Sequence, residues 1–420
     1  MLRAVALRRP PRSIEAGETS ARGLRLGSPS VLTHPPPTVF TMYAIPPIHR
    51  VTRAAIVALA LCTGCAGATP SPSPSPNPPA GSGAPSAGAS PLVQSTWPVR
   101  AREHLDLWLH SYALITDDTT LVPYFRRGYR DRINGVRRQR SVSSQLDANR
   151  SQLRARIDVQ PSLATSGQFL PLYFESWAQM RQVIDLFVGS GGNQGATNDP
   201  NLRTYFAILG SAFQSAADRE WLRTFVGSVD DESRRFYHDY WTSESNSRRF
   251  VTGHVDSLWQ RQWRPALQRF LNNTQQQNGE LYLSMPLGGE GRTVHFGKQQ
   301  NAVAGPMPDA LGDSENVLYV MAHEITGAAA SAAIEDNTTP ADRRAGVTSR
   351  YEQAAAVRAG AMLLEKTIPT AVPGYMRYYL QAAGRTAPTD PRSAFMSVFS
   401  LPDAVRDALT RQFDAILGGI

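Results

Sequence analysis

Cysteine is almost absent from this 420-residue sequence, and its two copies, Cys62 and Cys65, both stand near the N-terminus. Residues 66–420 therefore form no disulfide bond, offer no thiolate nucleophile and hold no zinc through cysteine. Three motifs that carry chemistry are also missing: a G-x-S-x-G elbow, a glycine-rich phosphate loop after a strand, and an EF-hand loop. Lysine occurs only at positions 298 and 366, so arginine supplies nearly all of the positive charge.

The formal net charge of +8 is unevenly distributed along the chain. Residues 1–65 hold eight arginines and two glutamates, a net +6, which leaves +2 for residues 66–420. Most of the charge thus lies in a segment that we expect to be removed, so we expect no nucleic-acid partner. An arginine-rich stretch at 126–140 is interpreted as a solvated helix face.

Residues 42–65 have the organisation of an export signal. Basic residues at 49–53 precede an apolar run at 54–61, which is shorter than the ~20 residues of a transmembrane helix. The sequence LCTGC that ends at Cys65 resembles the lipobox of bacterial lipoproteins, although Cys62 stands where that motif has an aliphatic residue. The resemblance implies that Cys65 receives diacylglycerol. The alternative is an ordinary cleaved signal.

Residues 66–95 alternate proline and serine and then turn to glycine, alanine and serine, a composition that cannot bury a core. We expect a linker that holds the folded part away from a membrane, with the protein exported and lipid-anchored to the bacterial cell envelope. Residues 1–41 are rich in arginine and proline and lack an apolar run. They are interpreted as a start codon assigned too early.

From residue 96 onward the pattern predicts an α+β fold that is predominantly helical. A helical domain is expected over 96–278, with amphipathic stretches at 104–115, 168–189, 201–227, 231–243 and 252–272. The period then changes, and strands are expected at 279–287, 292–297 and 301–306. One long helix at 313–336 and C-terminal helices at 343–366, 372–384 and 402–416 complete a second lobe over 279–420.

The sequence His323-Glu324-Ile325-Thr326-Gly327 is the first half of an H-E-x-x-H motif. Where both histidines are present, their spacing puts two imidazoles on one helix face to bind zinc, and the glutamate polarises the metal-bound water. Strands followed by such a helix resemble a gluzincin-type zincin metallopeptidase over about 279–366. The resemblance implies a zincin-like lobe, zinc ligands at His323 and Glu352, and Glu324 as the general base.

Gly327 departs from this motif because it replaces the second histidine. Two ligands remain where catalytic zinc usually has three. His295 is the nearest further donor in sequence, and His238 and His254 are the alternatives. Glycine inside a helix costs ~1 kcal/mol relative to alanine, so we expect a close packing contact at Gly327. His323 is then either a metal ligand or a core histidine bonded to a carboxylate or a carbonyl.

Two classes of function follow from these residues. The favoured one is an envelope-anchored, zincin-like scaffold with a degenerate site that binds a peptide or a partner protein without metal. The alternative is an active zinc-dependent peptidase or hydrolase with a rewired third ligand. In that alternative, the strand at 301–306 is expected to pair as an edge strand with an extended peptide.

Overall fold

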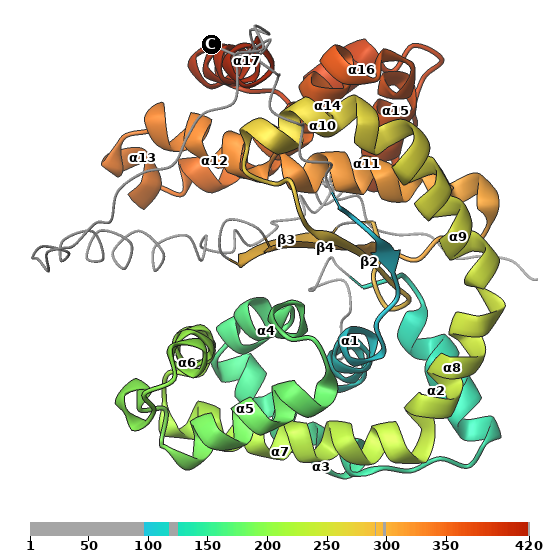
Figure 1. The fold of residues 1–420 in the computed structure, drawn as a ribbon, viewed down its shortest axis with the longest axis vertical. Coiled ribbons are helices and arrows are strands. Elements are labelled where there is room, and N and C mark those ends of the chain that lie inside the picture. The colour runs from blue at the N-terminus through green and yellow to red at the C-terminus, as the bar shows by residue number, and fades with distance from the viewer. Residues whose placement is uncertain (1–95, 117–124, 290, 297–299, 419–420) are drawn as a thin grey trace, which may run out of the picture. The chain divides into compact units, whose positions relative to one another are not determined.

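The computed structural model describes residues 96–116, 125–289, 291–296 and 300–418. The predicted signal, the linker and Cys65 lie outside the described residues. Helices dominate, and a four-stranded mixed sheet lies among them (Figure 1), which confirms the predicted α+β class. The first helices are α1 (Glu103–Ile115), α2 (Tyr129–Gln139), α3 (Gln145–Val159), α4 (Ser162–Gly167), η2 (Leu170–Tyr173), α5 (Trp177–Gly189), η3 (Gln194–Ala196), α6 (Pro200–Ala212), α7 (Ala216–Glu232), η4 (Ser233–Tyr237) and α8 (His238–Ser247).

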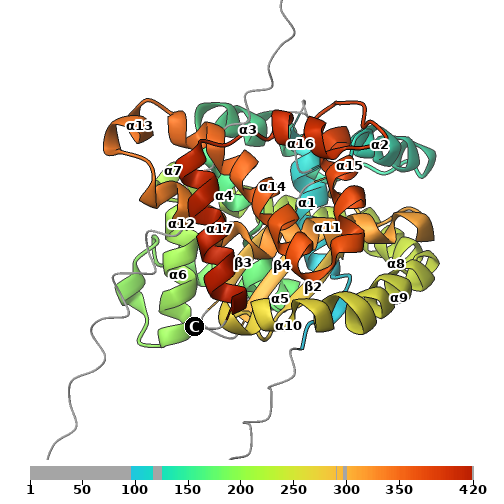
Figure 2. The ribbon, with the colours of Figure 1, turned by 90° about the horizontal axis from the view of Figure 1, so that it is seen from above.

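The first helices pack mainly on one face of the sheet, and the second group packs mainly on the opposite face (Figure 1). Its members are α9 (Arg249–Leu258), η5 (Trp259–Trp263), α10 (Arg264–Asn273), η6 (Leu311–Asp313), α11 (Ser314–Ile325), α12 (Gly327–Asp336), α13 (Pro340–Arg344), α14 (Val347–Thr367), η7 (Pro369–Ala371), α15 (Val372–Ala382), α16 (Arg392–Val398) and α17 (Asp403–Gly418). Seen from above, α11, α14 and α17 lie over β3 and β4 (Figure 2).

The sheet has the order β1-β2-β4-β3 and contains the three predicted strands. They are β2 (Glu280–Ser284), β3 (Arg292–Phe296) and β4 (Gln300–Pro306). β2 and β4 run parallel, while β3 is antiparallel to β4. The expectation that 301–306 is an edge strand is wrong, because β4 lies between β2 and β3. A two-residue strand, β1 (Val99–Arg100), adds to β2 and had no sequence signal of its own.

Both faces of the sheet are buried, each against a different hydrophobic core. Tyr282, Val294, Ala302 and Ala304 belong to the first core, which α1 and α3–α7 supply. Their neighbours along the strands, Leu281, Leu283 and Val303, belong to the second core with α11. The strict alternation of a β-strand therefore divides the residues of the sheet between two helical layers.

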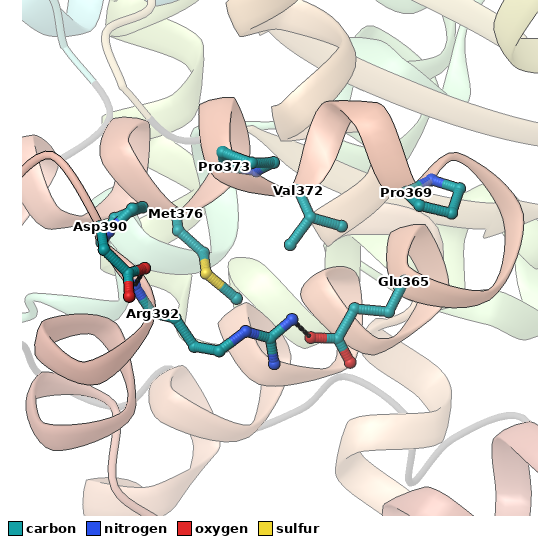
Figure 3. A pocket seen from close by; sticks show the side chains of 8 residues that line it. Glu365, Pro369, Val372, Pro373, Met376, Asp390 and Arg392 are labelled. Carbon is teal, nitrogen blue, oxygen red and sulfur yellow. Dashed lines mark hydrogen bonds and ion pairs between the residues drawn. The ribbon is translucent and has the colours of Figure 1, made fainter.

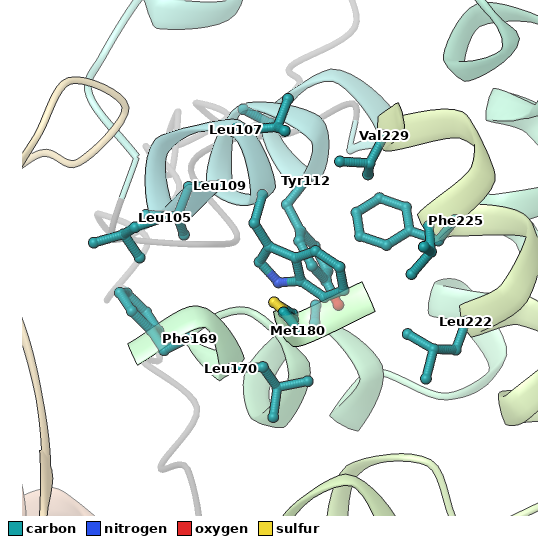
Figure 4. Packing of buried hydrophobic residues seen from close by; sticks show 14 of the residues in the cluster. Leu105, Leu107, Leu109, Tyr112, Phe169, Leu170, Met180, Leu222, Phe225 and Val229 are labelled. Carbon is teal, nitrogen blue, oxygen red and sulfur yellow. The ribbon is translucent and has the colours of Figure 1, made fainter. Parts of the chain in front are cut away.

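The first core is centred on the aromatic residues of α1. The ring of Phe225 lies 4.8 Å from that of Trp108, in edge-to-face orientation. It lies 4.9 Å from that of Tyr112, also edge to face (Figure 4). Such pairs add about 0.5–1.5 kcal/mol to the burial of their area. Trp259 and Trp263, by contrast, pack in the second core. The chain therefore passes from the first core to the second between α8 and α9. The helices α9 and α10 pack in the second core, although they fall within the predicted 96–278 domain.

The carboxylate of Glu232 stands at the centre of a buried polar cluster beside α1. It accepts hydrogen bonds from Arg137 (2.9 Å) and Ser144 (2.5 Å) on one oxygen and contacts His110 Nε2 (3.1 Å) with the other. Burial lowers the pKa of His110, so the imidazole is neutral, donates to Glu232 and accepts from the Tyr129 hydroxyl (3.1 Å). The cluster ties α1, α2, α3 and α7 together, because a buried charge must keep its partners.

The predicted helix at 313–336 is two helices that meet at Thr326. The Thr326 hydroxyl donates to the carbonyls of Ala322 (3.1 Å) and His323 (2.8 Å), and the Gln276 amide donates to that of Ile325 (3.0 Å). Side-chain donors of this kind compete with backbone N–H groups and interrupt a helix. Leu311–Asp336 is the one stretch of the described residues that is long and apolar enough to cross a membrane. Its apolar window is 61% buried, as expected for a core helix.

Asp106 on α1 provides a test of this packing. The carboxyl is fully buried and accepts from the Trp241 indole (2.9 Å), and burial raises its pKa to about 7. The folded protein thus favours the protonated form, so its contribution to stability is complete below about pH 4 and falls as the pH rises to about 7. Asp106→Asn mimics the protonated acid. We expect its stability advantage over the wild type to grow by on the order of 3 kcal/mol as the pH rises from 5 to 8.

Urea unfolding at the two pH values measures this change, and Asp185→Asn, at an exposed position of α5, is the matched control. A gain that does not depend on pH, or that the control shares, contradicts the assignment of the titration to Asp106.

Candidate functional site

The His-Glu pair lies in the last turn of α11, above the edge strand β3. The apolar residues that precede it, Val317, Val320 and Met321, are at most 1% exposed, as their spacing predicts. They fix α11 on the sheet, so that the side chain of Glu324 reaches down to β3. There the Thr293 hydroxyl donates to Glu324 Oε2 at 2.8 Å.

The turn before β3 approaches α11 closely, and Gly291 makes that approach possible. A Cβ atom at this position would lie 2.4 Å from the Ala304 carbonyl oxygen, 2.7 Å from a methyl group of Val320 and 3.1 Å from Cγ of Glu324. Any side chain here would push the turn away from the helix. From the other side, the Tyr378 hydroxyl on α15 donates to the Gly289 carbonyl (2.7 Å).

Glu324 is ionised in this setting. Burial favours its neutral form, but the hydrogen bond and charge of His323, the Thr293 hydroxyl and the charge of Arg292 outweigh burial, and the pKa is lowered. The His323 Nδ1 atom lies 3.2 Å from Glu324 Oε1. Both carboxylate oxygens therefore have partners within the protein.

The side chain of His323 is 15% exposed and lies beside α15. Its ring centroid is 5.4 Å from that of Tyr379, with the planes tilted by 32°. The carboxylate contact expected of a core histidine is present, and Glu324 supplies it.

The other predicted ligands have different neighbours. His295 is exposed on β3 and its Nδ1 lies 2.5 Å from Asn301 Oδ1. Glu352 is half-buried on α14, and burial, together with the charge of Glu335, raises its pKa. Of the alternatives, His238 pairs with Glu103 of α1 at 2.9 Å, and His254 lies half-buried on α9.

Within the ranges that the structure describes, no three His, Cys, Asp or Glu side chains come together to hold a metal ion. His323 and Glu324 meet, whereas His295 contacts Asn301 and Glu352 responds to the charge of Glu335. This donor set does not fit the three-ligand site of a catalytic zinc, and no step through zinc is derived from it.

The expected close packing contact at Gly327, inferred from the free-energy cost of glycine inside a helix, is absent. A Cβ atom there would meet nothing within 4 Å. The glycine instead begins α12 directly after the interruption at Thr326, where the backbone leaves the regular helical hydrogen-bond pattern. Space for a larger side chain is therefore available one helical turn after His323.

Thr293 and Tyr379 are the site residues that the sequence did not reveal. A signal for Thr293 exists, because strand alternation in 292–296 puts it on the same face as His295. Tyr379 has no such signal, since its approach to His323 depends on how α15 crosses α11.

Elsewhere, a pocket of about 310 Å³ lies between α14, α15 and α16 (Figure 3). Val372, Pro373 and Met376 form its apolar wall, and an ion pair of 2.8 Å joins Glu365 and Arg392 across it. No predicted site residue lines this pocket.

Comparison with known proteins adds no assignment: no family model, no curated protein and no solved structure matches the chain.

The space at Gly327 yields a direct test of the zincin resemblance. We expect Gly327→His to place an imidazole one turn after His323 and to create zinc binding that is lost again when His323→Ala is added. Ala328→His is the matched control, because it is rotated by about 100° around the helix. Zinc content by mass spectrometry after dialysis decides between the variants. If Gly327→His takes up no more zinc than Ala328→His, the two positions do not share a face, and the resemblance loses its main support.

Proposed function

We propose that this protein is a lipid-anchored envelope protein whose zincin-like half binds an extended peptide segment without catalysing its hydrolysis. The observation that carries the proposal is the pairing of Glu324 with Thr293 beside an edge strand. The residue expected to act as a general base instead connects α11 to β3.

A general base must be within hydrogen-bonding reach of the water or substrate proton that it removes. Both oxygens of Glu324 already have partners, Thr293 and His323. A carboxylate with a lowered pKa is also a weaker base at neutral pH than one whose pKa lies near 7. These properties favour a structural role for Glu324, in which it orients β3 for binding.

β3 is the end strand of the sheet, and no described strand pairs with its outer edge. An edge strand offers unpaired N–H and C=O groups, to which an extended peptide can add as a further strand. His295 is exposed on this strand and provides a side chain at the edge. The edge-pairing role first expected for 301–306 thus passes to 292–296.

The anchored location comes from the sequence: a signal at 42–65, lipidation at Cys65 and a linker over 66–95. The expected partner is then a peptide segment of an envelope protein, and nucleic acid is not expected.

The alternative is an active zinc-dependent hydrolase with a rewired third ligand. One observation favours it, namely that α14, which carries Glu352, packs directly against α11. In this alternative His323 and Glu352 hold zinc with His295 as third donor, which requires these side chains to move together.

The experiment is affinity selection of a random decapeptide library on the purified chain, with and without added zinc, followed by mass spectrometry of the bound peptides and of the metal. We expect bound peptides to be recovered intact and zinc to remain well below one atom per chain. Near one zinc per chain that is lost in His323→Ala, together with cleaved peptides, establishes the alternative.

The main-chain pairing is tested on the peptide rather than on the protein. Two versions of a selected peptide are compared, one N-methylated at the odd-numbered residues and one at the even-numbered residues. Because successive N–H groups of a strand point to opposite edges, only one version loses the N–H groups that face β3. We expect that version alone to lose binding. Equal binding by both contradicts pairing along β3.

A further inference from the structure

The charge of residues 66–420 is concentrated on one short helix and its flanks. Residues 126–140 hold seven arginines and one aspartate, a net +6. Because residues 66–420 carry +2 in all, the rest of that part of the chain carries −4. A near-neutral protein thus has one strongly cationic segment on an otherwise acidic body.

α2 keeps most of this charge in solvent because its apolar side is narrow. Tyr129, Ile133 and Arg137, spaced by four residues, are at most 5% exposed and face the core. Exposed arginines with no carboxylate within ion-pair distance among the described residues stand on α2 and at its two ends. They are Arg127 before the helix, Arg132 and Arg138 on it, and Arg140 at its C-cap.

Some exposed arginines on other helices have acidic partners, such as Arg392 with Glu365 (2.8 Å) and Arg406 with Asp403 (2.7 Å). What distinguishes residues 126–140 is the number of arginines that stand close together in the chain. The four exposed arginines of α2 and its two ends could gain little from such surface pairs, which contribute at most ~1 kcal/mol each. Seven arginines against the single Asp131 nevertheless give this part of the surface a positive potential.

The buried cluster around Glu232 holds this face in place. Arg137 points inward to Glu232 and forms a two-point ion pair with Asp147 (2.9 and 2.7 Å). Two of the outward arginines lie over aromatic rings: Arg132 is 5.7 Å from the Tyr129 ring and Arg140 is 5.8 Å from the Phe236 ring. The helix that presents the charge is therefore anchored by its own inward arginine.

We infer that the exposed arginine face formed by α2 and its two ends (Arg127, Arg132, Arg138 and Arg140) docks the protein on the anionic phospholipid headgroups of a membrane. Guanidinium groups bind phosphate oxygens in a bidentate manner, and a basic cluster is attracted to an anionic bilayer within a Debye length. The inference concerns a surface separate from the β3 edge.

The predicted linker allows this face to reach the bilayer. Thirty residues at ~3 Å each extend to about 90 Å, whereas a folded part of this size has a radius of gyration of about 20 Å. Such a tether lets the body turn any face to the membrane, so the charge of α2 selects the one that docks. In this part the inference rests on the proposed lipid anchor.

The test uses the full chain in its unlipidated form and sedimentation with vesicles of phosphatidylcholine, with and without phosphatidylglycerol. We expect binding only to the anionic vesicles, weakening as salt is added. Replacing the four arginines of the face by glutamine is expected to weaken binding by roughly fivefold per residue, several-hundred-fold in all. The matched control replaces four exposed arginines elsewhere, at Arg261, Arg343, Arg385 and Arg411, and is expected to change binding far less.

A variant with lysine at the four positions shows whether lost binding is due to lost charge or to a disturbed fold. It keeps the positive charge, so we expect it to keep most of the binding. Equal losses in the α2 variant and the control overturn the inference, as does equal binding to neutral vesicles. Tighter binding of a short DNA duplex through the same arginines also overturns it and points to a nucleic-acid partner. Because the protein is unlipidated and no peptide is present, none of these outcomes depends on the anchor or on the proposed peptide site.

Discussion

The structure depends on a sheet that is buried on both faces. Parallel pairing of β2 with β4 puts Leu281 beside Val303 on one side and Tyr282 beside Ala304 on the other. A slip of one residue would turn each set toward the wrong helical layer, so the two cores fix the register together. The same register carries Thr293 to the α11 face and Val294 to the α1 face. The contact between Glu324 and β3 is therefore a consequence of how the sheet is packed.

The first core contains a buried charge, the carboxylate of Glu232. Glu232 is fully buried, and burial alone would favour its neutral form, yet contacts with His110, Arg137 and Ser144 lower its pKa. Buried ion pairs of this kind add little net stability compared with apolar packing, but removing one partner is costly. Their effect here is positional, because the cluster sets how α2 and α3 lie against α1 and α7. An arginine-rich helix with only three inward positions gains a defined orientation in this way.

Sequence patterns predicted the elements of this fold better than their arrangement. Alternation and turn residues located β2, β3 and β4, and the periodicity of α11 identified Val317, Val320 and Met321 as buried. The order of the strands was not accessible, because β3 follows β2 in the chain but pairs outside β4. β1 consists of two residues, and its pairing with Leu281 and Tyr282 spans most of the folded chain. The interruption at Thr326 depends on the amide of Gln276, which no local pattern contains.

In the candidate site, too, some residues could be predicted from the sequence and others only from the packing. The His-Glu dipeptide is visible in the sequence, and so is the absence of a second histidine at Gly327. What the dipeptide does depends on groups that only packing brings close: the Thr293 hydroxyl, the Tyr379 ring and the turn at Gly291. In a zincin the glutamate must keep an oxygen available for a metal-bound water. Here a threonine on the edge strand donates to one of the glutamate's oxygens, and Gly327 stands where the H-E-x-x-H motif has its second histidine. The carboxylate connects α11 to β3, the strand whose outer edge is the proposed place for a peptide.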